Sequence, residues 1–328
     1  MKRLQAYGVF SDETVRAIEK VEKAQKKFAT YQDYFDSLGI SKPRLFIGSK
    51  RRGVPVVDIP ARAKNTKGVL VMHLPMSNPL DENQLFHVAT VVSALPEYRV
   101  ISFGNPSGKP YKYREQNRNL WQLLKIAFSK NRHALVSPEI DYLRKQGIRH
   151  AHHVGYSYGA QKALIEVGYL KPKEVASLAL LDPVAHPRSA IQLLNDFKTA
   201  FKPMGGYVNR TELKIFFDAR RDTSKTGHPI SALRRPISIA IGILMARFDF
   251  MTHLKELLAK HKTVKVSVAW GSESELGNDA HMATSLETLG KNYPKQVKRL
   301  RLEGDKHAFA NDIHLFAAIV YESLTTAP

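Results

Sequence analysis

Short apolar runs alternate with helical stretches along most of the chain, and this rhythm constrains the fold more than any other feature. Apolar strands separated by helices predict a mainly parallel sheet that is covered on both faces. The fold class is therefore α/β, with a parallel central sheet. We expect its strands at residues 69–72, 98–103, 148–156, 176–181, 263–270 and 297–302, preceded by two short strands at 45–48 and 54–59 around a turn at 49–53.

Two segments fall outside this rhythm. Residues 11–38 predict one amphipathic helix, because Ser11 is a suitable N-cap and apolar residues recur at helical spacing up to Gly39. Residues 187–261 read as several helices, and their apolar segment 237–245 indicates a buried helix or the wall of a pocket. We expect an N-terminal helical extension (1–43), a core (44–186 and 262–328) and a helical cap (187–261).

The motif Gly155-Tyr156-Ser157-Tyr158-Gly159 ends a predicted strand and precedes a predicted helix. A nucleophile on so sharp a turn needs small neighbours, because the backbone there is strained and tightly packed. The Tyr158 N–H would lie at the start of the helix, where it can face a developing oxyanion. This context makes Ser157 the candidate nucleophile.

Residues 152–160, which contain this motif, and residues 303–309 resemble the α/β-hydrolase superfamily, and the resemblance extends from about residue 44 to the C-terminus. It implies a catalytic triad in the chain order Ser, acid, His. Ser157 would be the nucleophile. His307, in the loop after the last predicted strand, would be the general base.

The acid departs from the family pattern. The resemblance places it three residues past a glycine, after the strand at 263–270. Gly271 is present, but Ser274 stands at the expected position. We favour Glu275, because a shift of one residue and a longer side chain would restore its reach to His307.

Other carboxylates remain open for this role. Asp182 follows the strand at 176–181, where a second variant of the family carries its acid, and it is the nearest alternative. Glu273 and Asp279 lie in the same stretch as Glu275.

The oxyanion hole also departs from the pattern. The resemblance implies a second N–H donor in a His-Gly segment after the strand at 69–72, but the residues here are His73-Leu74-Pro75-Met76. Pro75 has no N–H to donate. By position Leu74 is the expected second donor beside Tyr158, with Met76 as the alternative.

The 50 Lys and Arg residues against 30 Asp and Glu give a formal net charge of +20, which suggests an anionic partner. The basic clusters are scattered and are not interleaved with aromatic residues, which argues against nucleic acid as a partner. Those in the segment 187–261 would attract an anionic or lipid-like substrate. The chain has no cysteine, which excludes disulfides, thiolate metal sites and cysteine nucleophiles.

No cofactor and no metal are expected. Residues 104–110 resemble a phosphate-binding loop, but the spacing is one residue short and Pro110 replaces the metal-binding hydroxyl. His150, His152 and His153 lack carboxylates at ligand spacing. The N-terminus has no signal-peptide pattern, and the longest apolar run is far below the roughly 20 residues of a membrane span, which predicts a cytoplasmic protein.

Together these features predict a serine hydrolase that cleaves a carboxylic ester through an acyl-enzyme intermediate. The apolar segment 237–245 favours a hydrophobic acyl or alcohol part. The alternatives are an acyltransferase or a peptidase on the same scaffold, or a non-catalytic binding protein that retains the fold. The sequence does not indicate an oligomeric state.

Overall fold

A computed structural model describes residues 2–40, 45–47, 54–75, 82–104, 126, 128, 132–184, 189–224, 242–277 and 279–325. The turn expected at 49–53, Met76, residues 105–110 and the apolar residues 237–241 lie outside these ranges.

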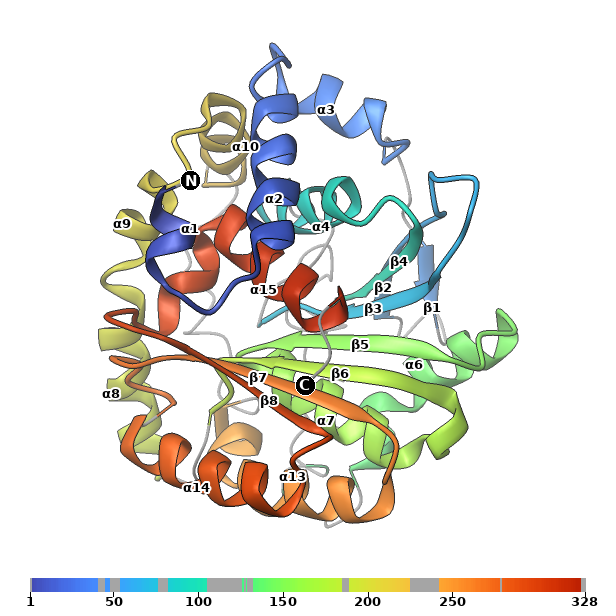
Figure 1. The fold of residues 1–328 in the computed structure, drawn as a ribbon, viewed down its shortest axis with the longest axis vertical. Helices are drawn as coiled ribbons and strands as arrows, with labels where there is room; N and C mark the ends of the chain where they lie inside the picture. The colour runs from blue at the N-terminus through green and yellow to red at the C-terminus, as the bar shows by residue number, and fades with distance from the viewer. Residues whose placement is uncertain are drawn as a thin grey trace.

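The core is one eight-stranded sheet with the order β1-β2-β4-β3-β5-β6-β7-β8 (Figure 1). Strand β2 pairs antiparallel with β1 and with β4, and the other neighbours pair parallel. The prediction of a mainly parallel sheet is confirmed. The strands are β1 (Leu45–Ile47), β2 (Val54–Ile59), β3 (Gly68–His73), β4 (Tyr98–Phe103), β5 (Ala151–Tyr156), β6 (Val175–Leu181), β7 (Lys265–Gly271) and β8 (Val297–Leu302).

Helices cover both faces of the sheet, which explains why the central strands are apolar on both sides (Figure 1). One face carries α2 (Asp12–Gln25), α4 (Glu82–Ala94), α10 (Lys214–Ser224) and α15 (Ile313–Thr325). The other carries α6 (His133–Lys145), α7 (Tyr158–Tyr169), α13 (Phe250–Lys260) and α14 (Asp279–Asn292). Each layer packs on the sheet through its own apolar cluster.

The prediction of a single helix over 11–38 is wrong. After a short α1 (Lys2–Ala6), the chain forms α2 and a separate α3 (Tyr31–Ser37). Ser11 caps α2 as expected, since its side chain accepts from the Thr14 N–H. The second helix starts because the Thr30 side chain accepts from the Asp33 N–H, which caps a new helix and ends the continuous pattern.

The described part of the segment between β6 and β7 is mainly helical. It holds α8 (Ala190–Phe201), α9 (Met204–Asn209), α10, a helical turn at residues 242–246, and α13. Helix α10 packs against α4, and α13 packs against α7, while α8 and α9 contact the 3-10 turn η2 (His307–Asn311). The division into extension, core and cap stays a prediction. Among the described residues, no helix is both long and apolar enough to cross a membrane.

Candidate active site

The candidate site lies at the carboxyl ends of the parallel strands. Ser157 follows β5, Asp182 follows β6, and the loop that begins after β8 leads to His307. Parallel neighbours end at the same edge of a sheet, so residues distant in the sequence are brought together there.

Ser157 sits in a strained backbone conformation. Its φ of 56° and ψ of −121° lie outside the usual regions for a residue with a side chain, and its N–H donates to the Leu181 carbonyl at 2.9 Å. A Cβ on Gly155 would lie 2.2 Å from the carbonyl oxygen of Gly159, and one on Gly159 would lie 2.0 Å from that of His73. The two glycines of the motif are therefore required by close backbone packing.

Three side chains form a continuous chain of hydrogen bonds. Ser157 Oγ lies 2.9 Å from His307 Nε2, and His307 Nδ1 contacts Asp182 Oδ2. The exposed fractions are 4% for Ser157, 2% for His307 and 0% for Asp182. In the tautomer with its proton on Nδ1, the imidazole donates a hydrogen bond to the carboxylate. Its Nε2 then accepts a hydrogen bond from the serine hydroxyl.

Asp182 is held by several donors besides His307. Its Oδ2 accepts from the Ser274 hydroxyl at 2.6 Å, and its Oδ1 accepts from the Gly271 N–H at 3.1 Å. Its own N–H donates to the Ala269 carbonyl at 2.7 Å, in a conformation with a φ of 39°. These contacts satisfy a fully buried carboxylate and fix its orientation.

The geometry contradicts our preference for Glu275 over Asp182. Among the described residues, the carboxylate of Asp182 contacts the His307 ring. The physical reason is that β6 pairs with β5, so Asp182, directly after β6, lies beside Ser157, directly after β5. Glu273 is exposed, and the side chain of Asp279 lies outside the described residues.

Aromatic groups position His307. The Tyr156 hydroxyl donates to the His307 carbonyl at 2.6 Å, and its ring stacks on the imidazole with centroids 5.5 Å apart. Burial raises the pKa of Tyr156 well above its usual range, so the hydroxyl stays protonated and donates. The Tyr207 hydroxyl accepts from the Lys306 N–H at 2.7 Å. Sequence reasoning missed both contacts, although Tyr156 lies within the serine motif.

Asp305, two residues before His307, is bound by the N-terminal segment and by the segment between β6 and β7. Tyr7 donates to its Oδ2 at 2.6 Å and Arg210 to its Oδ1 at 2.8 Å. Tyr7 follows α1 and Arg210 follows α9. No sequence signal links these residues, because they lie far apart along the chain and meet only in the folded structure.

The two expected oxyanion donors lie on adjoining segments. Tyr158 is the first residue of α7, and Leu74 follows β3 and is buried. A Cβ on Gly159 would also lie 2.7 Å from the Leu74 carbonyl oxygen, so the loop after β3 packs directly against the start of α7. Their role as donors stays a prediction, and Met76 lies outside the described residues.

The histidines around β5 do not converge. His150 is exposed, with Nδ1 3.2 Å from the Lys173 carbonyl, and His152 Nδ1 lies 2.8 Å from Ser177 Oγ. His153 points to the other face of the sheet, where it is buried with His73 and Glu166. Burial lowers the pKa of His73 to about 3 and that of His153 to about 4, so both rings are neutral near pH 7.

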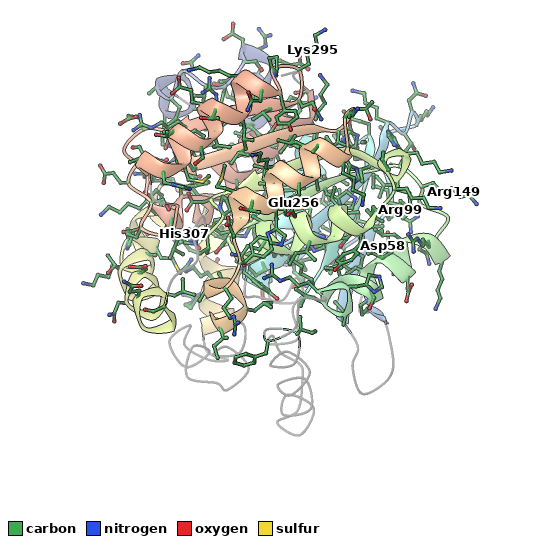
Figure 2. The ribbon with its side chains drawn as sticks, turned by 90° about the horizontal axis from the view of Figure 1, so that it is seen from below. Asp58, Arg99, Arg149, Glu256, Lys295 and His307 are labelled. Carbon is green, nitrogen blue, oxygen red and sulfur yellow. The ribbon has the colours of Figure 1, made fainter. Side chains whose placement is uncertain are left out.

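Basic side chains are spread over the molecule. Figure 2 shows Arg149 and Lys295 at separate places on the surface, and Arg99 beside Asp58, with which it forms a bidentate pair at 2.8 and 2.6 Å. Within the segment 187–261, Arg210 pairs with Asp305. The clusters at 50–52 and 234–235 lie outside the described residues. Attraction of an anionic substrate by this segment stays a prediction.

Comparisons with known proteins agree on the fold. No protein-family model and no curated protein matches this sequence. Among solved structures, an esterase of Pyrococcus furiosus has a TM-score of 0.56 at 11% identity, covering 88% of this chain and 92% of its own. A carboxylesterase of Nitrososphaera gargenis has a TM-score of 0.52 at 13% identity, covering 84% and 96%.

A third solved structure, the meta-cleavage product hydrolase of Pseudomonas fluorescens, has a TM-score of 0.52 at 15% identity, covering 83% of this chain and 94% of its own. Identities this low establish the architecture and not the activity. The described strand order and these neighbours together show that the chain has the α/β-hydrolase fold.

Proposed function

We propose that this chain, which has the α/β-hydrolase fold, is a serine hydrolase that cleaves a carboxylic ester through an acyl-enzyme intermediate. The observation that carries the proposal is the buried hydrogen-bonded chain from Ser157 through His307 to Asp182. A serine, an imidazole and a carboxylate in this order activate a nucleophile, and they do so on several unrelated folds.

In the proposed mechanism Ser157 Oγ attacks the carbonyl carbon of the ester as its proton passes to His307 Nε2. Asp182 stabilises the imidazolium that forms and holds its tautomer. The N–H groups of Tyr158 and Leu74 bind the oxyanion of the tetrahedral intermediate. When that intermediate collapses, His307 returns the proton to the departing alcohol. Water then attacks the acyl-enzyme by the same route, which releases the acid and restores Ser157.

The substrate we propose is a small ester with a hydrophobic acyl or alcohol part. The apolar segment 237–245 supports this choice, and so do neighbours whose names describe an esterase and a carboxylesterase. We further propose that basic residues of the segment 187–261 favour an anionic or lipid-like ester.

The first experiment is labelling with a fluorophosphonate probe, which reacts with an activated serine. We expect the wild-type protein to take up one probe and Ser157→Ala to take up none. The control is Ser285→Ala, because Ser285 also lies within 3.3 Å of a histidine, His281, but on helix α14 away from the strand ends. Absence of labelling in the folded wild-type protein would support the non-catalytic alternative.

The second experiment assigns the reaction class. Turnover of p-nitrophenyl esters of graded chain length, abolished by Ser157→Ala, is the expected result, with a maximum at medium or long chains. Labelling without ester turnover, together with cleavage of peptide probes or transfer to added alcohols, would instead indicate a peptidase or an acyltransferase.

A further inference from the structure

A second polar cluster lies beneath the nucleophile and takes no part in the proposed mechanism. His73 ends β3, His153 lies within β5, and Glu166 lies on α7. All three side chains are fully buried. One donor atom from each lies within 4.8 Å of the other two.

The distances within this cluster are short, but the contacts are not hydrogen bonds. His73 Nε2 lies 2.9 Å from Glu166 Oε2, and His153 Nδ1 lies 3.4 Å from Glu166 Oε1. Even so, the ring nitrogens and both carboxylate oxygens have no hydrogen-bond partner among the described residues. The nitrogens face the carboxylate closely, therefore, without directing an N–H at it.

This is the relation expected between two ligands of one metal ion. The lone pair of each ligand points at the ion and not at the neighbouring ligand. Zinc bonds of about 2.0 to 2.2 Å at angles between a right angle and the tetrahedral angle separate donor atoms by about 2.8 to 3.6 Å. The two observed contacts lie in that interval.

Charge in the surrounding interior points the same way. Lys162 Nζ contacts Glu139 Oε1, so these two buried charges balance each other. Glu166 contacts His73 and His153 and has no direct ion pair with a Lys or Arg among the described residues. Burial of a carboxylate is costly, and a divalent cation would add positive charge directly beside it.

We propose that His73, His153 and Glu166 bind one divalent transition-metal ion of the zinc type. Two imidazoles and a carboxylate form a ligand set that zinc uses in proteins. Since the ligands are fully buried, the role is structural and the ion does not contact the substrate. It would join the strand that leads to Leu74, the strand that leads to Ser157, and the helix that Ser157 begins, so it would stabilise both sides of the proposed oxyanion hole.

The test uses the full-length protein without an affinity tag, freed of metal with a chelator. We expect it to bind one Zn²⁺ per chain, with a rise in Tm of about 5 °C at saturation. Co²⁺ should give visible absorption bands when it binds to the metal-free protein. Less than one Zn²⁺ per chain, with no change in Tm and no such bands, would overturn the proposal and leave a network that shares a proton.

Variants locate the site. His153→Gln and Glu166→Gln should each lose the Co²⁺ bands and the Tm response. The matched control is His152→Gln, because His152 neighbours His153 but contacts Ser177 on the other side of the strand, and this variant should bind like the wild type. Wild-type binding by both cluster variants would contradict the assignment. If both fail to fold, the wild-type titration decides, since it requires no substitution. These readouts do not involve ester cleavage, so they are independent of the proposed function.

Discussion

Ser274 occupies the position at which the family pattern places the triad acid, and it donates its hydroxyl to Asp182 from the next strand. The carboxylate of Asp182 thus lies at the end of β6, and the serine that donates to it lies in the loop after the neighbouring strand β7. Ser274 therefore lies beside the carboxylate that contacts His307. The sequence contained both positions, but their distances to the ring depend on how β6 and β7 pair.

The first prediction separates the two acids that the sequence left open. Asp182→Asn should lower kcat by about 10³ to 10⁴-fold, because an amide cannot stabilise the imidazolium and favours the wrong tautomer. Glu275→Gln, a change of the same size and charge, should retain most of the wild-type rate. Ester turnover measured at saturating substrate checks both variants, and the reverse order of effects would restore Glu275 as the acid.

The second prediction concerns Ser274 as a positioning residue. Ser274→Ala removes a 2.6 Å hydrogen bond to a buried carboxylate and should lower kcat about tenfold with little change in KM. The control is Ser272→Ala, in the same loop, whose hydroxyl accepts from the Gly304 N–H and does not contact Asp182. Equal kinetics in the two variants would show that Ser274 does not support the triad.

At the scale of elements, the loop that carries His307 is held by the N-terminal segment and by the segment between β6 and β7. Tyr7, after α1, and Arg210, after α9, both bind Asp305, while Arg3 pairs with the buried Asp312 just beyond η2. The N-terminal helices thus do more than cover the sheet. They also bind the loop that carries His307.

This arrangement predicts a kinetic effect from a residue remote in sequence. Tyr7→Phe should lower kcat roughly fivefold, with KM unchanged, because the loop loses one hydrogen bond to a charged partner. Tyr321→Phe is the matched control, since its hydroxyl also donates to a carboxylate of the N-terminal segment, Glu13, at 3.0 Å. Both variants should lower Tm, but an equal loss of kcat in the control would mean that the effect is global.

The sequence predicted elements better than the breaks within them. The strands of the parallel sheet lie where apolar runs placed them, because burial on both faces demands such runs. The break between α2 and α3 was missed, since apolar spacing continued across it and only the Thr30 cap marks a new start. A single N-cap residue such as Thr30 is a weaker sequence signal than an apolar pattern that continues over many residues.

The whole chain has a formal net charge of +20, and within its described part basic side chains such as Arg149 and Lys295 lie at separate places (Figure 2). Several cations of the described surface are engaged in local pairs, such as Lys291 with Glu287 and Arg301 with Glu303. Exposed pairs of this kind contribute little to stability. The net charge therefore affects the strength of binding to charged molecules, but it does not identify the binding partner of the chain.

A stability prediction follows from buried histidines. Burial lowers the pKa of His152 from 6.5 to about 4. Between pH 6.5 and 4 this imidazole is therefore protonated in the unfolded chain but mostly neutral in the folded chain. The free energy of unfolding should therefore fall as the pH drops from 6.5 to 4, by at most about 1.4 kcal/mol per pH unit for this group. His152→Gln should reduce that slope in urea unfolding measured across the same range, and identical slopes would contradict it.

The sequence by itself determined the sheet and the strained turn at Ser157, because hydrophobic periodicity and a local motif carry that information within short stretches. Its resemblance to the α/β-hydrolase superfamily indicated His307 as the candidate partner of that serine. Only the tertiary structure decided that Asp182 and not Glu275 contacts His307, that Tyr7 and Arg210 hold the loop, and that His73, His153 and Glu166 meet. Those contacts depend on strand pairing and helix packing between residues far apart in the chain, and no local pattern encodes the resulting distances.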